Sequence, residues 1–99
     1  MRIFHIVPAA TWESFDGAFL TNDSLDVEGF IHCSFEEQVD GVIQRYFASA
    51  GAIAILEIDP ARLTSPLVAE PSTGGEIYPH VYGPIDREAI VGSEIRQAS

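Results

Sequence analysis

The sequence predicts a small α+β domain with two helices and several short strands. Three observations predict this class. Residues 35–48 repeat apolar side chains at helical spacing, residues 52–58 form a continuous apolar run of strand length, and most other strand-like segments follow these two instead of alternating with helices. A chain of 99 residues can bury one core, so residues 1–99 are expected to form a single domain.

The first third of the chain is expected to hold a strand, a helix and a loop. Residues 2–7 are rich in Ile, Val and Phe, which is typical of a strand. A short helix should follow from Pro8 or Ala9 to residue 15, because proline is tolerated in the first helical turn, where its missing N–H would have no partner. The acidic segment 23–28 is expected to be a solvated loop, since its carboxylates lack the order of calcium ligands in an EF-hand.

The second helix is expected over residues 35–48. Ser34 and Glu37 have the spacing of a capping box, in which each side chain satisfies a backbone N–H at the helix start. Gly51 is placed to end the helix. The apolar residues of one face would form a buried stripe, and they are Val39, Val42, Ile43, Tyr46 and Phe47.

Strands are expected on both sides of this helix. Residues 30–34 precede it, and residues 52–58 follow it as a central strand that is buried on both faces. Further strands are expected at residues 67–70, 78–82 and 89–95, with a single helical turn at residues 60–63 and a flexible loop at residues 71–76.

The charge of the chain excludes several classes of partner. Five arginines and no lysine oppose 15 acidic residues, which gives a formal net charge of −10. Nucleic acids and anionic membranes are bound mainly through Lys and Arg, so neither is an expected partner. The single cysteine, Cys33, allows no internal disulfide, and no segment has the apolar length of a signal peptide or of a spanning helix. These features favour a cytoplasmic protein and set no oligomeric state.

Three histidines occupy the centres of predicted strands that are otherwise apolar. They are His5, His32 and His80. Side chains at i and i+2 share a face of a strand, so each imidazole is expected to lie among apolar or aromatic neighbours. An imidazole in such a place is costly unless its ring nitrogens find hydrogen-bond partners.

The histidines have more than one interpretation. In the first, each is a structural residue bonded to a nearby carbonyl or hydroxyl group. In the second, the three converge on one cleft with Ser34, Tyr82 and a carboxylate such as Glu70. A zinc site is a third alternative, although the histidines lack the close pairing of zinc motifs. Cys33 neighbours His32 in the strand, so their side chains point to opposite faces, and the thiol is expected to be a buried apolar group.

Four segments of the chain resemble one bacterial family. They are Ile3-Phe4-His5-Ile6, the run EGFIHCS from Glu28 to Ser34, the run LEID from Leu56 to Asp59, and the run PHVYGP from Pro79 to Pro84. The family is called domain of unknown function 952, and the resemblance covers essentially the whole chain. It implies the ADP-ribosyltransferase-like fold, a small α+β structure with split and packed sheets, with which this family has been grouped.

The resemblance also implies roles for individual residues. In proteins of this fold, a histidine or arginine of the first strand contacts the adenosine ribose of NAD, and a polar residue of the second strand lies near the nicotinamide. His5 resembles the first of these, and His32 with Ser34 resembles the second. A later glutamate stabilises the oxocarbenium-like transition state, and Glu70 is its best match, although no motif around Glu70 marks it.

Some features of the superfamily are missing from the sequence. It has no acidic pair of the arginine-specific transferases, no stacking tyrosine beside His32, and no arginine-rich set of the RNA 2'-phosphotransferases. An acidic chain also offers few countercharges to the pyrophosphate of NAD. His80 and Tyr82 belong to the signature of the 952 family itself. The resemblance therefore implies a fold more firmly than a reaction.

The leading functional hypothesis is a histidine-lined cleft that binds NAD or another nucleotide-like small molecule, with no cofactor established. Its catalytic form would perform ADP-ribosyl transfer or NAD hydrolysis. The alternative is a non-catalytic interaction or dimerisation module with singly buried histidines, and a metal-dependent hydrolase is the second alternative. In the catalytic form Glu70 and His32 are the catalytic residues, and His5, Ser34, His80 and Tyr82 bind the ligand.

Stability measurements separate a functional role of the histidines from a structural one. If the histidines serve function, His32→Phe and His80→Phe should cost less stability than Ile55→Ala and Val42→Ala, because truncation of a core side chain typically costs about 2–5 kcal/mol. Thermal melting of the four variants measures the difference. Equal or greater losses for the histidine variants would indicate a structural role.

Overall fold

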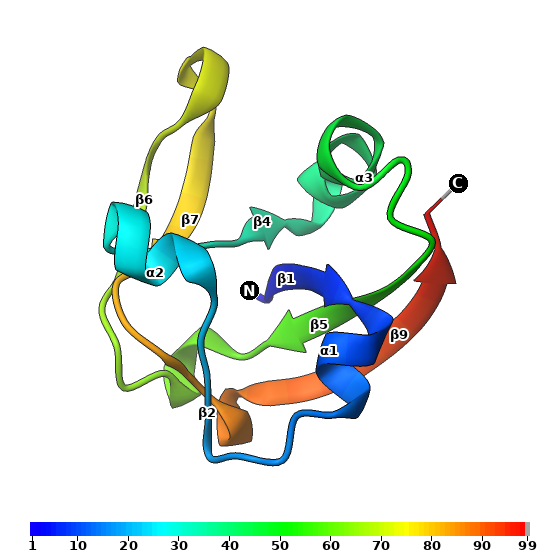
Figure 1. Cartoon of the computed structure of the whole chain (residues 1–99). Helices are drawn as coiled ribbons and strands as arrows, with labels where there is room; N and C mark the ends of the chain where they lie inside the picture. The colour runs from blue at the N-terminus through cyan, green and yellow to red at the C-terminus, as the bar shows by residue number, and fades with distance from the viewer. Residues whose placement is uncertain (99) are drawn as a thin grey trace.

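A four-stranded antiparallel sheet is the largest element of the computed structural model, which describes residues 1–98 (Figure 1). Its strands follow the order β4-β1-β5-β9. The register places His5 of the first strand opposite Leu56 of the central one. The four strands are β1 (Ile3–Pro8), β4 (Ser34–Phe35), β5 (Ala52–Ile58) and β9 (Ile90–Gln97).

Two smaller sheets and three α-helices complete the described part of the chain, so the predicted α+β class is confirmed, with one helix more than expected. One sheet has the order β3-β7-β6, from β3 (Ile31–His32), β6 (Leu67–Pro71) and β7 (Ile77–Val81). The other pairs β2 (Phe19–Leu20) with β8 (Ile85–Asp86). The helices are α1 (Ala9–Glu13), α2 (Asp23–Glu28) and α3 (Val39–Tyr46), and 3-10 turns lie at Glu36–Gln38, Pro60–Arg62, Thr73–Gly75 and Arg87–Ala89.

The core is built on both faces of β5, as its apolar sequence predicts. The face of β5 that carries Leu56 packs against the two smaller sheets, since Leu56 belongs to one buried cluster with Ile31 of β3 and Ile85 of β8. Each fully buried side chain of this size contributes about 1.5–3 kcal/mol. The opposite face of β5 is covered by α3. The buried residues of this second cluster, from β1, α3 and β5, are Ile6, Val39, Ile43, Ile53 and Ile55.

The strand predicted over residues 30–34 is wrong as a single element. It is interrupted at Cys33, where the chain leaves the three-stranded sheet and enters the four-stranded one, because β3 pairs with β7 and β4 pairs with β1. The backbone N–H of Cys33 donates to the carbonyl of Pro79 at 3.0 Å. Alternation of side chains shows no sign of a change of partner strand. The crossing places His32 and Ser34 at the junction of the two sheets.

The long helix is shorter than the predicted range 35–48, and its predicted capping box is wrong. Ser34 does not cap, because it is a buried residue of β4 that pairs with β1. The 3-10 turn before α3 takes up Glu37. The side-chain carbonyl of Gln38 accepts the backbone N–H of Phe35 at 2.9 Å at this helix start.

The acidic segment 23–28, predicted to be a loop, forms the helix α2. Asn22 caps this helix, since its side-chain oxygen accepts the N–H of Ser24 at 3.0 Å. Two aspartates lie in the first turn, where the helix dipole favours negative charge. Gly29 ends the helix with a φ of 87°, which favours glycine. No residue of α2 is fully buried.

The other predicted elements are confirmed with small shifts of their ends. They are β1, α1, β5, β6, β7, β9 and the helical turn after β5. The strands β2 and β8 have two residues each, which is too short to produce a pattern in the sequence. No helix in the described part of the chain is long and apolar enough to cross a membrane.

Gly83 lies in a turn where a side chain has no room. A Cβ atom at this position would lie 2.3 Å from Oγ and 2.9 Å from Cβ of Ser65. The Ser65 hydroxyl is held in place because it donates to the carbonyl of Pro84 at 2.7 Å. Gly83→Ala should therefore lower the free energy of unfolding by about 1–3 kcal/mol, measured by urea denaturation.

Gly41→Ala is the matched control for this experiment. Gly41 lies inside α3, and the nearest atom to its added Cβ would be Nη2 of Arg45 at 3.8 Å. Alanine is favoured over glycine in a helix, so the control should gain about 0.5–1 kcal/mol. Wild-type stability in Gly83→Ala would contradict the packing described for the turn.

Candidate ligand site

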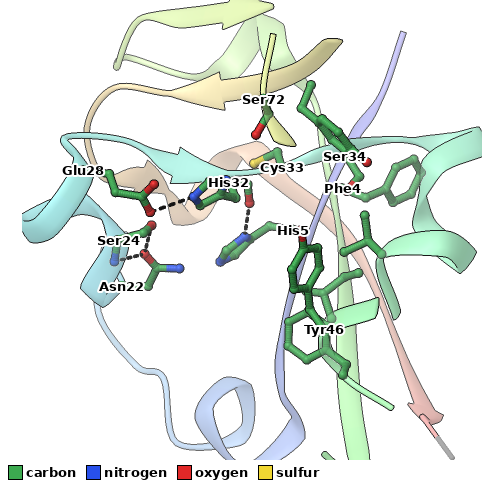
Figure 2. A pocket seen from close by; sticks show the side chains of 14 residues that line it. Phe4, His5, Asn22, Ser24, Glu28, His32, Cys33, Ser34, Tyr46 and Ser72 are labelled. Carbon is green, nitrogen blue, oxygen red and sulfur yellow. Dashed lines mark hydrogen bonds and ion pairs between the residues drawn. The ribbon is translucent and has the colours of Figure 1, made fainter. Parts of the chain in front are cut away.

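A cavity of about 420 Å³ lies between β1, the β3–β4 junction, α2, α3 and the β6–β7 hairpin (Figure 2). It has one polar and one aromatic side, because different elements contribute to its walls. Polar side chains on the first side include His5, Asn22, Glu28 and His32, and aromatic side chains on the second include Phe4 and Tyr46.

His5 is buried, and one hydrogen bond determines its tautomer. Its Nδ1 lies 2.8 Å from the carbonyl oxygen of His32. Because a carbonyl oxygen only accepts, Nδ1 carries the proton. Burial lowers the pKa of His5 from 6.5 to about 4, so the ring is neutral at pH 7 and its Nε2 presents a lone pair. This buried Nε2 has no hydrogen-bond partner among the described residues.

His32 connects the cavity to α2. Its Nε2 donates to Oε2 of Glu28 at 2.8 Å, and both side chains are almost half exposed. Its backbone carbonyl accepts from His5, so His32 orients both the His5 imidazole and the Glu28 carboxylate. This wall therefore offers two kinds of hydrogen-bond acceptor to a ligand, an imidazole nitrogen and a carboxylate.

The start of α2 adds a donor to the cavity. Oδ1 of Asn22 accepts the N–H of Ser24 at 3.0 Å and lies 2.5 Å from the hydroxyl of the same serine. Because capping uses the oxygen, the NH₂ group of Asn22 is the part of the amide that can donate to a ligand. Ser34, predicted to bind ligand, lines the cavity together with Ser72.

The other predicted residues form a cluster outside the described lining of the cavity. Nδ1 of His80 donates to Oε2 of Glu70 at 2.6 Å, and the hydroxyl of Tyr82 donates to the same oxygen. These bonds, that of Tyr82 first, lower the pKa of Glu70. The bond to Glu70 raises the pKa of Tyr82. The Glu70 carboxylate therefore already serves as the acceptor for its own neighbours.

The three histidines nevertheless belong to one connected group. His32 and His80 face each other across β3 and β7, with ring centroids 5.3 Å apart, and Phe30 stacks on His80 at 4.1 Å. His5 joins the group through the carbonyl of His32. The structure brings His5, His32 and Ser34 to the cavity and keeps the other three predicted residues beside it.

Cys33 is a buried apolar group, as predicted. Its side chain belongs to the core cluster, and burial raises the pKa of the thiol to about 12, so the reactive thiolate is suppressed. Within residues 1–98, no three His, Cys, Asp or Glu side chains are arranged to hold a metal ion. The zinc alternative therefore lacks a ligand set in that part of the chain.

The sequence gives weak signs of the α2 wall, which pattern reasoning missed. Asn22 stands one residue before DSLDVE, and Gly29 follows that run, which is the spacing of a capped helix that ends at glycine. Glu28 precedes His32 by four residues and opens the run EGFIHCS. Acidic composition hides these signs, because acidic segments are more often loops.

A family model described as "Protein of unknown function (DUF952)" matches residues 6–93. The chain belongs to this family. The match confirms the resemblance found in the motifs, and the family name states no activity. No match is found among the curated proteins.

Solved structures of protein CC0527 from Caulobacter crescentus have the fold of this DUF952 chain. The crystal structure matches with a TM-score of 0.84 at 24% identity, over 96% of this chain and 85% of that chain. The solution NMR structure matches with a TM-score of 0.78 at 25% identity, over 94% of this chain and 82% of that chain. These matches show a shared fold and name no activity.

His5 should make stability depend on pH. Its pKa is about 4 in the folded protein and 6.5 when exposed, so the unfolded chain binds more protons between these values. Stability is therefore fully present above pH 6.5 and falls as the pH is lowered toward 4. The loss at pH 5 relative to pH 7.5 should be about 2 kcal/mol.

His5→Asn tests this origin, because the asparagine amide can still donate to the His32 carbonyl but does not titrate. Urea denaturation at pH 7.5 and pH 5 should show that the loss of unfolding free energy due to His5 disappears in His5→Asn. The control His32→Asn, which changes an exposed imidazole, should show the same loss as the wild type. The same pH dependence in wild type and His5→Asn would contradict the assignment.

Proposed function

We propose that this DUF952 member binds a nucleotide-like small molecule, NAD or a relative of NAD, in the cavity. The observation that carries the proposal is Nε2 of His5, a buried acceptor on the cavity wall without a partner in the described structure. Leaving such an acceptor unpaired costs about 1–3 kcal/mol. A hydroxyl or amide N–H of a ligand would remove this cost by donating to Nε2.

The remaining lining suits the two parts of a nucleoside. Phe4, Tyr46 and Phe47 provide apolar surface for a flat base. His5 and Glu28 provide acceptors for the hydroxyl groups of a ribose. The cavity of about 420 Å³ falls within the range of roughly 300–1,000 Å³ that is common for small-molecule sites.

The grouping of family 952 with the ADP-ribosyltransferase-like fold is the basis for proposing a reaction at the same place. In this reaction the bond between C1' of the ribose and the nicotinamide breaks, and nicotinamide leaves with the bonding electrons. Water or an acceptor hydroxyl then attacks C1' and loses its proton. Positive charge develops on the ribose before the attack, and a nearby carboxylate stabilises it.

Glu28 is the carboxylate for this role. It lines the cavity, whereas Glu70 is engaged by His80 and Tyr82 outside the described lining. His32 positions Glu28 through the 2.8 Å hydrogen bond from Nε2. The proposal thus keeps His32 at the site and transfers the role first expected for Glu70 to Glu28.

The alternative of an interaction module with singly buried histidines fits the geometry less well. The His5 ring donates to the backbone carbonyl of His32, and the His32 ring lies beside that of His80 across paired strands. The histidines are therefore in contact with one another and not buried singly, as that interpretation expects. Nε2 of His5 is in addition a buried, unpaired acceptor on a residue that lines the cavity, whereas the equally unpaired Nε2 of His80 belongs to a residue outside the lining.

Calorimetric titration with NAD, ADP-ribose and nicotinamide riboside tests the binding proposal. His5→Asn should weaken binding by about 5- to 100-fold, because it keeps the donor toward His32 but loses the acceptor. His5→Gln is the matched variant, since its side-chain oxygen can reach the place of Nε2, and it should recover part of the affinity. No heat from any of the three ligands would overturn the proposal.

Release of nicotinamide from NAD tests the reaction separately. Glu28→Gln should lower the rate by about 100-fold, the effect of removing one preorganised electrostatic group, while Glu70→Gln should change it less. Binding of NAD without release of nicotinamide would retain the ligand site and reject the reaction.

A further inference from the structure

We propose that Arg45 is the anion-binding residue of the cavity and receives a phosphate of the ligand at the α3 edge, with the nucleoside directed toward His5. This inference rests on the proposed function, because it orients the same ligand. It adds a recognition residue that neither the sequence motifs nor the cavity lining contains.

The position of Arg45 is set by two residues that do line the cavity. Its Nη2 donates to the hydroxyl oxygen of Tyr78 on β7 at 2.6 Å, and its guanidinium carbon lies 5.9 Å from the ring centroid of Tyr46. Arg45 belongs to the last turn of α3, so it bridges from that helix to the hairpin. A guanidinium has five N–H donors, and the bond to Tyr78 uses one of them.

Arg45 differs from the other arginines in its charge environment. It makes no ion pair with a carboxylate of residues 1–98, although acidic residues outnumber arginines three to one. Arg87 also lacks such a pair but lies over the rings of Trp12 and Phe15. The three arginines that pair with Asp or Glu are Arg2, Arg62 and Arg96.

One carboxylate, that of Glu76, lies near this place and is linked to Arg45 only through Tyr78. Oε1 of Glu76 accepts from the hydroxyl of Tyr78 at 3.3 Å, and Oε2 accepts from Nε2 of Gln38 at 2.8 Å. Tyr78 therefore separates Glu76 from Arg45. A planar guanidinium can bind a phosphate through two parallel hydrogen bonds, and Glu76 occupies none of the Arg45 donors, because it contacts Tyr78 instead.

The acceptors and the cation lie against different parts of the lining. His5 of β1 and Glu28 of α2 line the cavity, whereas Arg45 lies outside the lining and contacts two of its members, Tyr46 and Tyr78. A ligand that donates at one end and carries an anion at the other matches both. Arg45 would also supply the positive charge for a nucleotide phosphate, which the acidic composition of the chain gave little reason to expect.

The test compares each nucleoside with its own 5'-monophosphate by calorimetry, using adenosine with AMP and nicotinamide riboside with its phosphate. In the wild type the phosphate should tighten binding by about tenfold, the effect of a charge-assisted hydrogen bond. Arg45→Gln should remove this gain and leave nucleoside affinity within about twofold. Arg62→Gln, which removes the same charge at a residue outside the lining, should preserve the gain. Raising the salt concentration should reduce it.

The outcomes distinguish the two proposals. Equal binding of nucleoside and monophosphate by the wild type, or equal loss of both in Arg45→Gln, would overturn the role of Arg45 and leave the ligand site intact. Retention of the full phosphate gain in Arg45→Gln would overturn it as well. Failure of the wild type to bind any of the four compounds would overturn the proposed function itself.

Discussion

The hydrogen bond from His5 to the carbonyl of His32 joins two sheets that have no strand in common. His5 belongs to the four-stranded sheet and His32 to the three-stranded one. The bond sets the tautomer of the imidazole, since Nδ1 donates to the backbone carbonyl and the buried Nε2 is left as an acceptor without a partner among the described residues. The crossing of the chain at Cys33 makes this contact possible, because it brings the end of β3 next to β1.

The sequence predicted the regular parts of the fold well, because their side chains repeat at a fixed period. The apolar run of β5 and the stripe of α3 are examples. Elements that depend on distant partners could not be predicted in this way. The break at Cys33 requires β7 to hold one half of the segment and β1 the other, and no local pattern reports that. Ser34 is likewise held in a strand by β1, which overrides its local preference for capping.

The candidate site was predicted in part for the same reason. Strand alternation identified His5 and His32, because a polar residue in an apolar strand is conspicuous. It gave no reason to consider the carboxylate of Glu28 beside that of Glu70, because segment 23–28 was expected to be a loop and reaches the cavity only through the packing of α2. The net charge of −10 favours protonation of the histidines, and burial opposes their protonation. At His5 burial prevails and the ring stays neutral.

The helix α2 forms one wall of the cavity although none of its residues is fully buried. Its main apolar anchor is the partly buried Leu25. Segments with so few apolar contacts open at a lower free energy than the core does. A molecule that binds in the cavity, as the proposed function has it, would contact the helix that the core holds least, so its binding should raise the free energy at which this helix opens.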